Sequence, residues 1–156
     1  MINGINAIDE LYVLGNPLMS MFSFASDTIN VFQLADALRR RGWRLQPQFT
    51  TPRSPRNLHV SVSYGVACNV DTLLADIATC VDEVRQMPPI DPEFVRSVVE
   101  ALVQDSSPAV VEGLLAAIGI QPGALPQEMA PINEVLDALP DAVANAVVIE
   151  FVNNLY

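Results

Sequence analysis

Residues 30–41 read NVFQLADALRRR and residues 57–64 read NLHVSVSY, and these two stretches decide the fold of the first half of the chain. In the first stretch, apolar residues recur every three or four positions, which is the spacing of one face of a helix. In the second stretch, apolar and polar residues alternate, as in a strand with one buried face. We therefore predict a helix from Asn30 to Arg41 and a strand from Asn57 to Tyr64. The apolar face of this strand comprises Leu58, Val60, Val62 and Tyr64.

Both ends of the predicted helix carry boundary signals. Asn30 is a favoured N-cap residue, and Gln33 follows three positions later, as in a capping box. The arginines at 39–41 occupy the last turn, where positive charge complements the helix dipole, and Gly42 ends the helix. We interpret the three arginines as a solvated helix end, with an anion-binding site as the alternative.

Short strands are predicted on both sides of the helix. Leu11–Leu14 and Met19–Ala25 are separated by the turn signal Gly15-Asn16-Pro17, which favours an antiparallel hairpin. After the helix, Trp43–Gln46 is predicted as a strand that stops at Pro47. The order strand-strand-helix-strand-strand predicts a compact, mainly antiparallel unit.

Beyond this unit the pattern is helical. A helix is predicted over Val70–Met87, and Pro88 follows it as the predicted domain boundary. Further helices are predicted over Pro92–Gln104, Pro108–Ile118 (closed by Gly119), Ile132–Leu139 and Pro140–Asn154. The predicted fold class is α+β. A β-β-α-β-β-α domain spans residues 1–88, and a helical C-terminal extension over residues 89–156 packs on it or on a partner.

The net charge of −10 is unevenly distributed along the chain. Residues 1–64 contain six arginines and four acidic residues, whereas residues 65–156 contain two arginines and fourteen acidic residues. We expect the first half to attract anions more readily, and the second half to repel nucleic acids and anionic lipids.

The composition also excludes several functions. All eight basic residues are arginines, so the chain offers no lysine for a Schiff base with a carbonyl cofactor and none for a P-loop. No apolar run reaches the ~18–20 residues of a membrane span, and residues 1–5 do not resemble a signal peptide, so we expect a cytoplasmic protein. Cys68 and Cys80 match neither metal-ligand nor disulfide spacing, and we expect two buried structural thiols.

Four stretches carry a resemblance to a known family. They are Leu14–Phe24 (LGNPLMSMFSF), Ile29–Asp36 (INVFQLAD), Arg41–Leu45 (RGWRL) and Leu58–Ser63 (LHVSVS). In their order and spacing, residues 11–85 resemble the C-terminal small domain of pyridoxal-phosphate (PLP) enzymes of fold type I. The resemblance is to the group II decarboxylase and sphingosine-1-phosphate lyase branch. Residues 91–156 contribute little to it.

The resemblance implies a small domain of the PLP-dependent transferase type, packed beside a large cofactor-binding domain. PLP is the cofactor of the complete family enzyme, and the missing lysine implies that this chain alone neither holds PLP covalently nor turns over substrate. The implied function is the C-terminal domain of a PLP-dependent carbon–carbon lyase or decarboxylase. A homodimer or a chain that supplies the large domain is the expected partner. The alternative is a non-catalytic self-association or partner-binding module derived from that domain.

Four residues are candidates for substrate or domain contacts. Decarboxylases of this group place an arginine on the last small-domain strand to bind the substrate carboxylate, and the matching position here is Ser61. This departure favours the lyase branch, whose phosphorylated amino-alcohol substrates have no carboxylate. Arg53 and Arg56, on the loop before the strand, would then meet a phosphate. His59 would line the mouth of the active site or make a structural hydrogen bond at a domain contact.

We assign no catalytic, cofactor-binding or metal-ligating residue to this chain. The single histidine has no cysteine cluster or second histidine at metal-ligand spacing. Asp76, Asp82 and Glu83 are expected to form a solvated helix face, and Trp43 is expected to be a packing anchor in the family's Arg-Gly-Trp turn.

Overall fold

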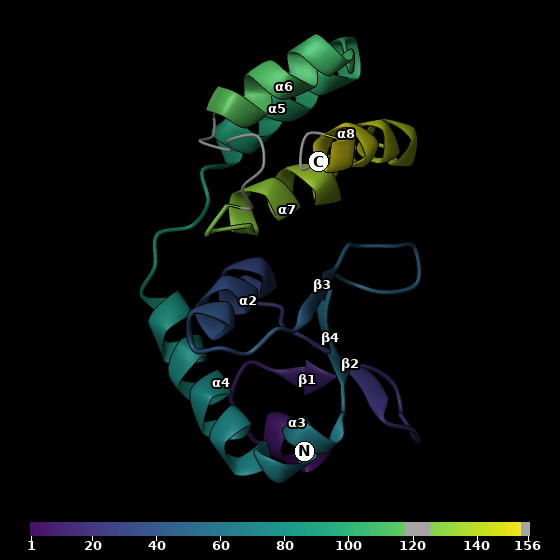
Figure 1. The fold of residues 1–156 in the computed structure, drawn as a ribbon. Helices are drawn as coiled ribbons and strands as arrows, with labels where there is room; N and C mark the ends of the chain where they lie inside the picture. Colours follow the sequence, from purple (N-terminus) through teal and green to yellow (C-terminus); the bar gives the residue numbers. More distant parts are fainter. Residues whose placement is uncertain (118–125, 154–156) are drawn as a thin grey trace. The chain divides into compact units, whose positions relative to one another are not determined.

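The computed structural model describes residues 1–117 and 126–153, apart from a few side chains within them. The chain divides into two compact units, Met1–Pro89 and Ile90–Tyr156, which are described separately (Figure 1).

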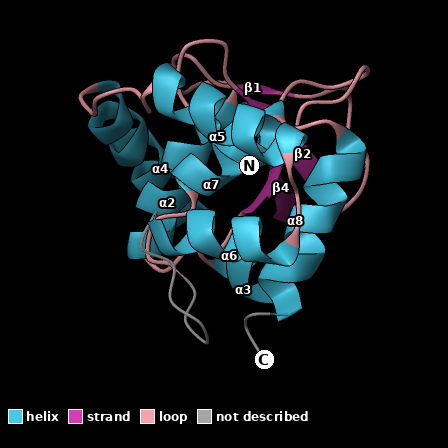
Figure 2. Ribbon diagram, turned by 90° about the horizontal axis from the view of Figure 1, so that it is seen from above, coloured by secondary structure: helices cyan, strands magenta, loops and turns pink. Residues whose placement is uncertain are grey.

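The first unit contains a small antiparallel sheet and four helices (Figures 1 and 2). Its strands are β1 (Tyr12–Val13), β2 (Met21–Ala25), β3 (Gln46–Gln48) and β4 (Asn57–Ser61). Its helices are α1 (Ile2–Ile5), α2 (Val31–Arg40), α3 (Tyr64–Cys68) and α4 (Val70–Arg85). The strand order is β1-β2-β4-β3, and every neighbouring pair is antiparallel. The predicted α+β class and the β1–β2 hairpin are thus confirmed.

One face of the sheet forms the core of this unit. Phe22, Phe24, Leu58 and Val60 occupy the same face by register and alternation, and each is at most 6% exposed. Helix α2 packs against β3, β4 and α4. Because it is covered from several directions, every residue from Val31 to Leu38 is buried, including the polar Gln33 and Asp36.

Helix α2 begins and ends close to the predicted positions. The side chain of Asn30 accepts hydrogen bonds from the backbone N–H groups of Phe32 and Gln33. The side-chain Nε2 of Gln33 donates a hydrogen bond to the backbone carbonyl of Pro88 at 3.1 Å. The sequence pattern did not indicate this partner. Arg41 is the C-cap, and Gly42 follows with a φ of +90°, a left-handed conformation that glycine adopts without strain.

Two strand predictions were wrong in detail. Strand β4 ends at Ser61, and Tyr64 begins α3 with 87% of its surface exposed, rather than continuing the apolar strand face. The local reason is Ser63, which caps α3 by accepting a hydrogen bond from the N–H of Val66. Pro47 lies inside β3 rather than ending it; the sheet tolerates it because β3 is an edge strand.

The second unit is helical throughout its described part. It contains α5 (Pro92–Gln104), α6 (Pro108–Ala117), α7 (Ala130–Ala138) and α8 (Asp141–Asn153). The side chain of Asp91 caps α5, with Pro92 in its first turn, as the sequence predicts. Helix α5 packs against α7, and α6 packs against α8. The predicted helix end at Ile118 and Gly119 lies outside the described residues.

The core of the helical unit is apolar. Its buried residues are Val98, Leu102, Val111, Ile132, Val135, Leu139 and Val147. A cavity of about 30 Å³ remains among these side chains, and only apolar residues line it. This volume leaves no room for a drug-sized ligand. Across the parts of the chain that the structure describes, no helix has the length and apolar character of a membrane span.

Candidate functional site

The second face of the sheet in the first unit is polar. His59 on β4 lies between Ser23 on β2 and Gln46 on β3 in the antiparallel register. The three side chains therefore share one face. His59 Nδ1 and Ser23 Oγ are 3.4 Å apart, at the long limit of a hydrogen bond, and both side chains are half-buried. We call this row the polar sheet face.

Exposed apolar side chains lie at one end of this face. Strand β2 begins and strand β4 ends at the pair Met21–Ser61, so the segments beyond these two residues leave the sheet at the same end. Ser61 is exposed. The exposed fractions of the apolar side chains are 90% for Leu18, 79% for Met19, 55% for Met21 and 87% for Tyr64. We refer to these four residues as the apolar rim.

The two arginines predicted to meet a phosphate lie at the opposite end of β4. Arg56 precedes the strand, and its guanidinium lies 5.4 Å from the centre of the Phe32 ring, a cation–π distance. Phe32 is a core residue of α2, so Arg56 is directed to the helical side of the sheet rather than to the polar face. Arg53 is exposed on the same loop, and its guanidinium has no polar partner within residues 1–117 and 126–153. Ser61 and Arg56 are separated by roughly 16 Å of extended chain.

The loop before β4 is held by a buried amide. Asn57 is 3% exposed, and its Nδ2 donates to the Pro55 carbonyl at 3.0 Å and to Ser54 Oγ at 3.3 Å. Its Oδ1 has no hydrogen-bond partner among the atoms that the structure describes. Asn57 thus fixes the loop that carries Arg53 and Arg56, a role that sequence reasoning missed.

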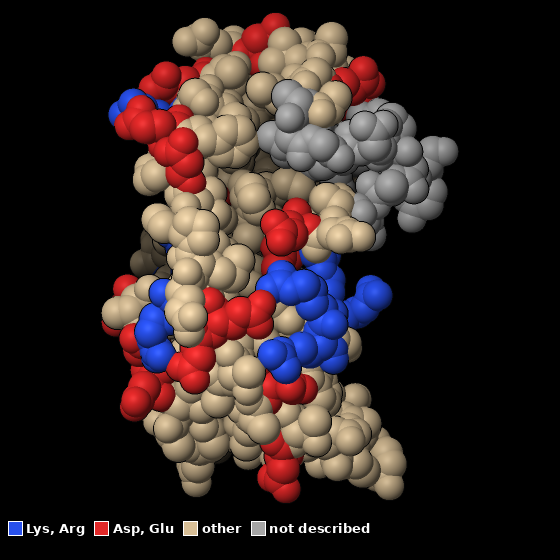
Figure 3. Space-filling view, turned by 90° about the vertical axis from the view of Figure 1, so that its left-hand side faces the viewer, with Lys and Arg blue, Asp and Glu red and all other residues tan. Residues whose placement is uncertain are grey.

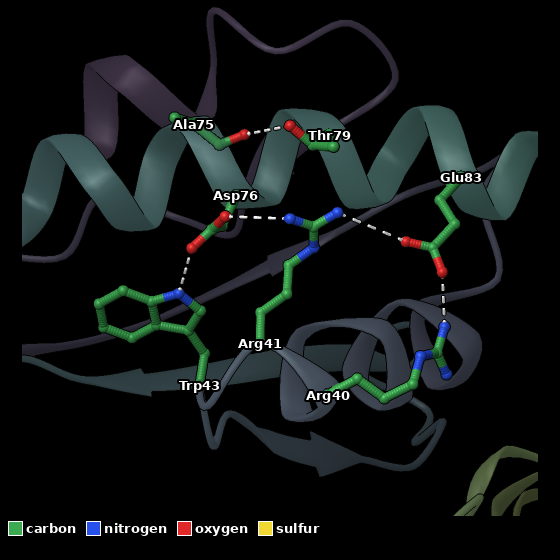
Figure 4. A network of polar contacts seen from close by, with 7 residues as sticks. All are labelled: Arg40, Arg41, Trp43, Ala75, Asp76, Thr79 and Glu83. Atoms are coloured by element: carbon green, nitrogen blue, oxygen red, sulfur yellow. Dashed lines mark hydrogen bonds and ion pairs between the residues drawn. The ribbon is translucent and has the colours of Figure 1, made fainter.

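The arginines at the C-terminal end of α2 contact acidic residues on α4. Arg40 Nη2 is 2.7 Å from Glu83 Oε1, and Arg41 lies 3.4 Å from Asp76 and 3.8 Å from Glu83 (Figure 4). Trp43 Nε1 donates to Asp76 Oδ2 at 2.7 Å. Arginine side chains gather on one face of the molecule with carboxylates beside them (Figure 3). Asp76 and Glu83 therefore connect α4 to the C-terminal end of α2. The sequence analysis predicted a solvated helix face for these acids and did not predict this contact.

The two cysteines lie in different environments. Cys80 is fully buried on α4, and burial raises the pKa of its thiol more than the nearby Arg41 guanidinium lowers it. Cys68, at the end of α3, is exposed, so the prediction of two buried thiols was wrong for this residue. The sequence analysis predicted no helix before Val70 and so missed α3, the short helix that carries Cys68 and is separated from α4 by Asn69.

Covalently attached PLP does not fit the residues of this chain. Covalent PLP binding requires a lysine, which the sequence lacks. Within the described ranges, no group of three or more histidine, cysteine or acidic side chains lies together as metal ligands would. A depression of about 360 Å³ exists elsewhere in the first unit, lined by Glu10, Asn30, Gln33 and Arg85 among others. No residue of the polar sheet face lines it.

Comparison with known proteins relates this chain to one group of enzymes. Residues 90–154 match the family described as "Pyridoxal-dependent enzyme, C-terminal putative HTH domain". The sphingosine-1-phosphate lyase of Oryza sativa is 31% identical over 85 residues, or 54% of this chain. The Saccharomyces cerevisiae lyase is 33% identical over 78 residues, or 50% of this chain. This chain resembles the C-terminal region of sphingosine-1-phosphate lyases.

The matched region is a small part of each lyase. The chain spans 15% of the Oryza protein and 13% of the Saccharomyces protein. A solved structure of the Burkholderia pseudomallei lyase aligns with a TM-score of 0.48 and 25% identity, over 66% of this chain and 21% of that one. The matches to the curated lyases confirm the resemblance inferred from residues 11–85. The family match in residues 90–154 was missed, because its helices carry generic apolar spacing and no distinctive motif.

Proposed function

We propose that this chain is the substrate-side domain of a PLP-dependent carbon–carbon lyase that acts on phosphorylated amino alcohols. In this proposal the lysine that holds PLP belongs to a cofactor-binding domain that these 156 residues do not include. The observation that carries the proposal is the polar sheet face with its apolar rim. On one side of the first unit, hydrogen-bonding groups lie next to exposed apolar side chains. A domain that covers the active-site cleft of a neighbouring domain needs both kinds of group on its contact surface.

The residues of this face would bind and orient rather than react. His59 offers one ring nitrogen to Ser23, and the other can meet a group across the cleft. Ser61 is small and neutral, so no cation at this position selects a carboxylate-bearing substrate. Arg53, whose guanidinium has no partner in the described part of the chain, is the better phosphate candidate, because Arg56 is engaged with Phe32.

The choice of lyase over decarboxylase rests on Ser61 and on the relatives. A decarboxylase of this group needs an arginine where Ser61 stands. The relatives with the matched region are sphingosine-1-phosphate lyases by name. Together these two observations support a phosphorylated amino alcohol as the substrate class.

Reconstitution tests the proposal. The purified chain is mixed with PLP and sphingosine 1-phosphate, with and without a lyase cofactor-binding domain that lacks its own C-terminal region. We expect no aldehyde product from the chain alone, and product from the mixture. A His59→Ala variant should lower turnover by the mixture, whereas Thr79→Val on α4 should not. Turnover by the chain alone, or decarboxylation of an amino acid by the mixture, would refute the proposal.

The second candidate function is a non-catalytic self-association module. The apolar rim favours it, because Leu18 and Met19 expose most of their surface, and exposed apolar patches mark interaction sites. Light scattering after size-exclusion chromatography separates the two functions. A dimer that Leu18→Ser converts to monomer, in a chain that fails to reconstitute turnover, supports the module.

A further inference from the structure

The helical unit matches a family named for a helix-turn-helix, yet its charge opposes nucleic-acid binding. Residues 90–156 contain ten acidic residues and one arginine, a net charge of −9. That arginine, Arg96 on α5, forms ion pairs with Glu93 and Glu100. Proteins that bind nucleic acids neutralise phosphates with lysine and arginine side chains. Here the summed field repels phosphates, so the charge of the unit disfavours a nucleic acid as its partner.

Helix α8 exposes an apolar stripe. Val148, Ile149 and Val152 are 40%, 62% and 44% exposed, and their spacing places them on one face of the helix with Asn145. The opposite face is directed to the core through Val147, which is 6% exposed. The stripe is therefore additional to the face that the unit uses for its own packing.

The charge of the helical unit limits which partners the stripe can bind. Helix α8 contains no basic residue, and Asp141 lies on the same helical face as the stripe, four residues before Asn145. A second copy of this unit would bring another −9 charge to the contact and would be repelled. A partner with basic residues beside its apolar side chains would be attracted.

We propose that the α8 stripe binds an amphipathic helix of a partner protein whose apolar face is flanked by lysine or arginine. Val148, Ile149 and Val152 supply the apolar contact, since a partner helix recognises anchors at three- and four-residue spacing. The net negative charge of the unit, with Asp141 on the same face of α8, attracts the basic flanks and disfavours acidic partners and nucleic acids. This inference does not depend on the proposed lyase function.

Fluorescence anisotropy with the full chain tests the inference. The probes are a labelled amphipathic peptide of about 18 residues with a leucine face and lysine flanks, the same peptide with glutamate flanks, and a labelled DNA duplex. We expect the lysine peptide to bind at least about tenfold more tightly than either other probe. The affinity of the lysine peptide should decrease when NaCl is raised from about 0.05 M to about 0.3 M, because salt screens the attraction between the charges.

Matched variants assign the binding to the stripe. Ile149→Ser should lower the affinity for the lysine-flanked peptide by at least about fivefold, because the substitution removes apolar area from the contact. Val103→Ser, at a 52% exposed position on α5, should leave the affinity unchanged. Equal binding of both peptides, tighter binding of DNA, or equal affinity of Ile149→Ser and the parent chain would each overturn the proposal. A dimer that Ile149→Ser dissociates would also overturn it, in favour of a second copy.

Discussion

The indole Nε1 of Trp43 donates a 2.7 Å hydrogen bond to Asp76 Oδ2, joining the turn after α2 to α4 across 33 residues of sequence (Figure 4). The second oxygen of Asp76 faces Arg41 at 3.4 Å. The Asp76 carboxylate thus contacts both the Trp43 indole and the Arg41 guanidinium, which lie in the turn that follows α2. Since α2 and α4 pack against each other, this bond fixes the exit of the chain toward β3.

We predict that Trp43→Phe destabilises the chain by about 1 kcal/mol, because the aromatic packing stays and one hydrogen bond to a half-buried carboxylate is lost. Asp76→Ala should cost about 1–2 kcal/mol, because it leaves the Trp43 N–H and the Arg41 guanidinium without this acceptor. Urea unfolding of both single variants and the double variant gives the coupling between the two residues. Asp71→Asn, in the first turn of α4, is the control. A coupling near zero would show that the bond does not contribute.

We predict that Glu83 contributes less to the free energy of unfolding than Asp76 does, although Glu83 contacts two arginines. Its partners Arg40 and Arg41 are 44% and 37% exposed in their side chains, and ion pairs in water contribute little. We expect Glu83→Gln to lower the free energy of unfolding by no more than about 0.5 kcal/mol, and less at high salt. Unfolding midpoints at two salt concentrations measure this. A loss as large as that of Asp76→Ala would contradict the ranking.

The local features of the first unit were predictable from sequence because they are local. Asn30 and Gly42 bound α2 through short-range backbone chemistry, and alternation alone placed Leu58 and Val60 in the core. The wrong strand end at Tyr64 shows the limit of this reasoning. Alternation continues through Val62 and Tyr64, but the capping bond of Ser63 turns the chain into a helix.

The environment of the candidate site was not predictable, because it depends on register. The sequence singles out His59 but cannot say that Ser23 and Gln46 lie beside it on neighbouring strands. It groups Arg53 and Arg56 with His59 by proximity along the chain. Three-dimensional packing instead places the Arg56 guanidinium over Phe32, a contact between residues 24 positions apart that no short motif encodes.

Gly42 has a φ of +90°, and we predict that Gly42→Ala destabilises the chain by about 1–2 kcal/mol. No atom of the described residues would clash with the added methyl group, so the expected cost is backbone strain. Gly65→Ala in α3 is the matched control, because its φ is ordinary and only Ser63 Oγ, at 3.9 Å, would meet the new Cβ. Thermal unfolding of both variants measures the difference. Equal melting temperatures would argue against strain as the reason for glycine at position 42.

The two thiols should react at very different rates. Cys68 is exposed, whereas Cys80 is fully buried, and burial raises the pKa of the Cys80 thiol. We expect a thiol reagent at neutral pH to modify Cys68 at once and Cys80 only after denaturation. Cys68→Ser should remove the fast phase and leave the slow one. A fast phase that survives this substitution would place Cys80 within reach of solvent.

Asp105 should make the helical unit sensitive to acid. The backbone N–H of Ser107, together with its side chain, donates to the Asp105 carboxylate and holds its pKa below the ordinary value of 3.8. Because the folded form resists protonation of this group, its contribution is present above pH 3.8 and is lost as the pH falls through the lowered pKa. Asp105→Asn keeps an acceptor without a titrating proton, so its stability should depend less on pH below about 4. Carboxyl NMR titration of the parent chain, with unfolding of the Asn variant at about pH 6 and about pH 3, checks both statements. An Asp105 midpoint at or above 3.8 would show that the Ser107 hydrogen bonds do not hold the carboxylate.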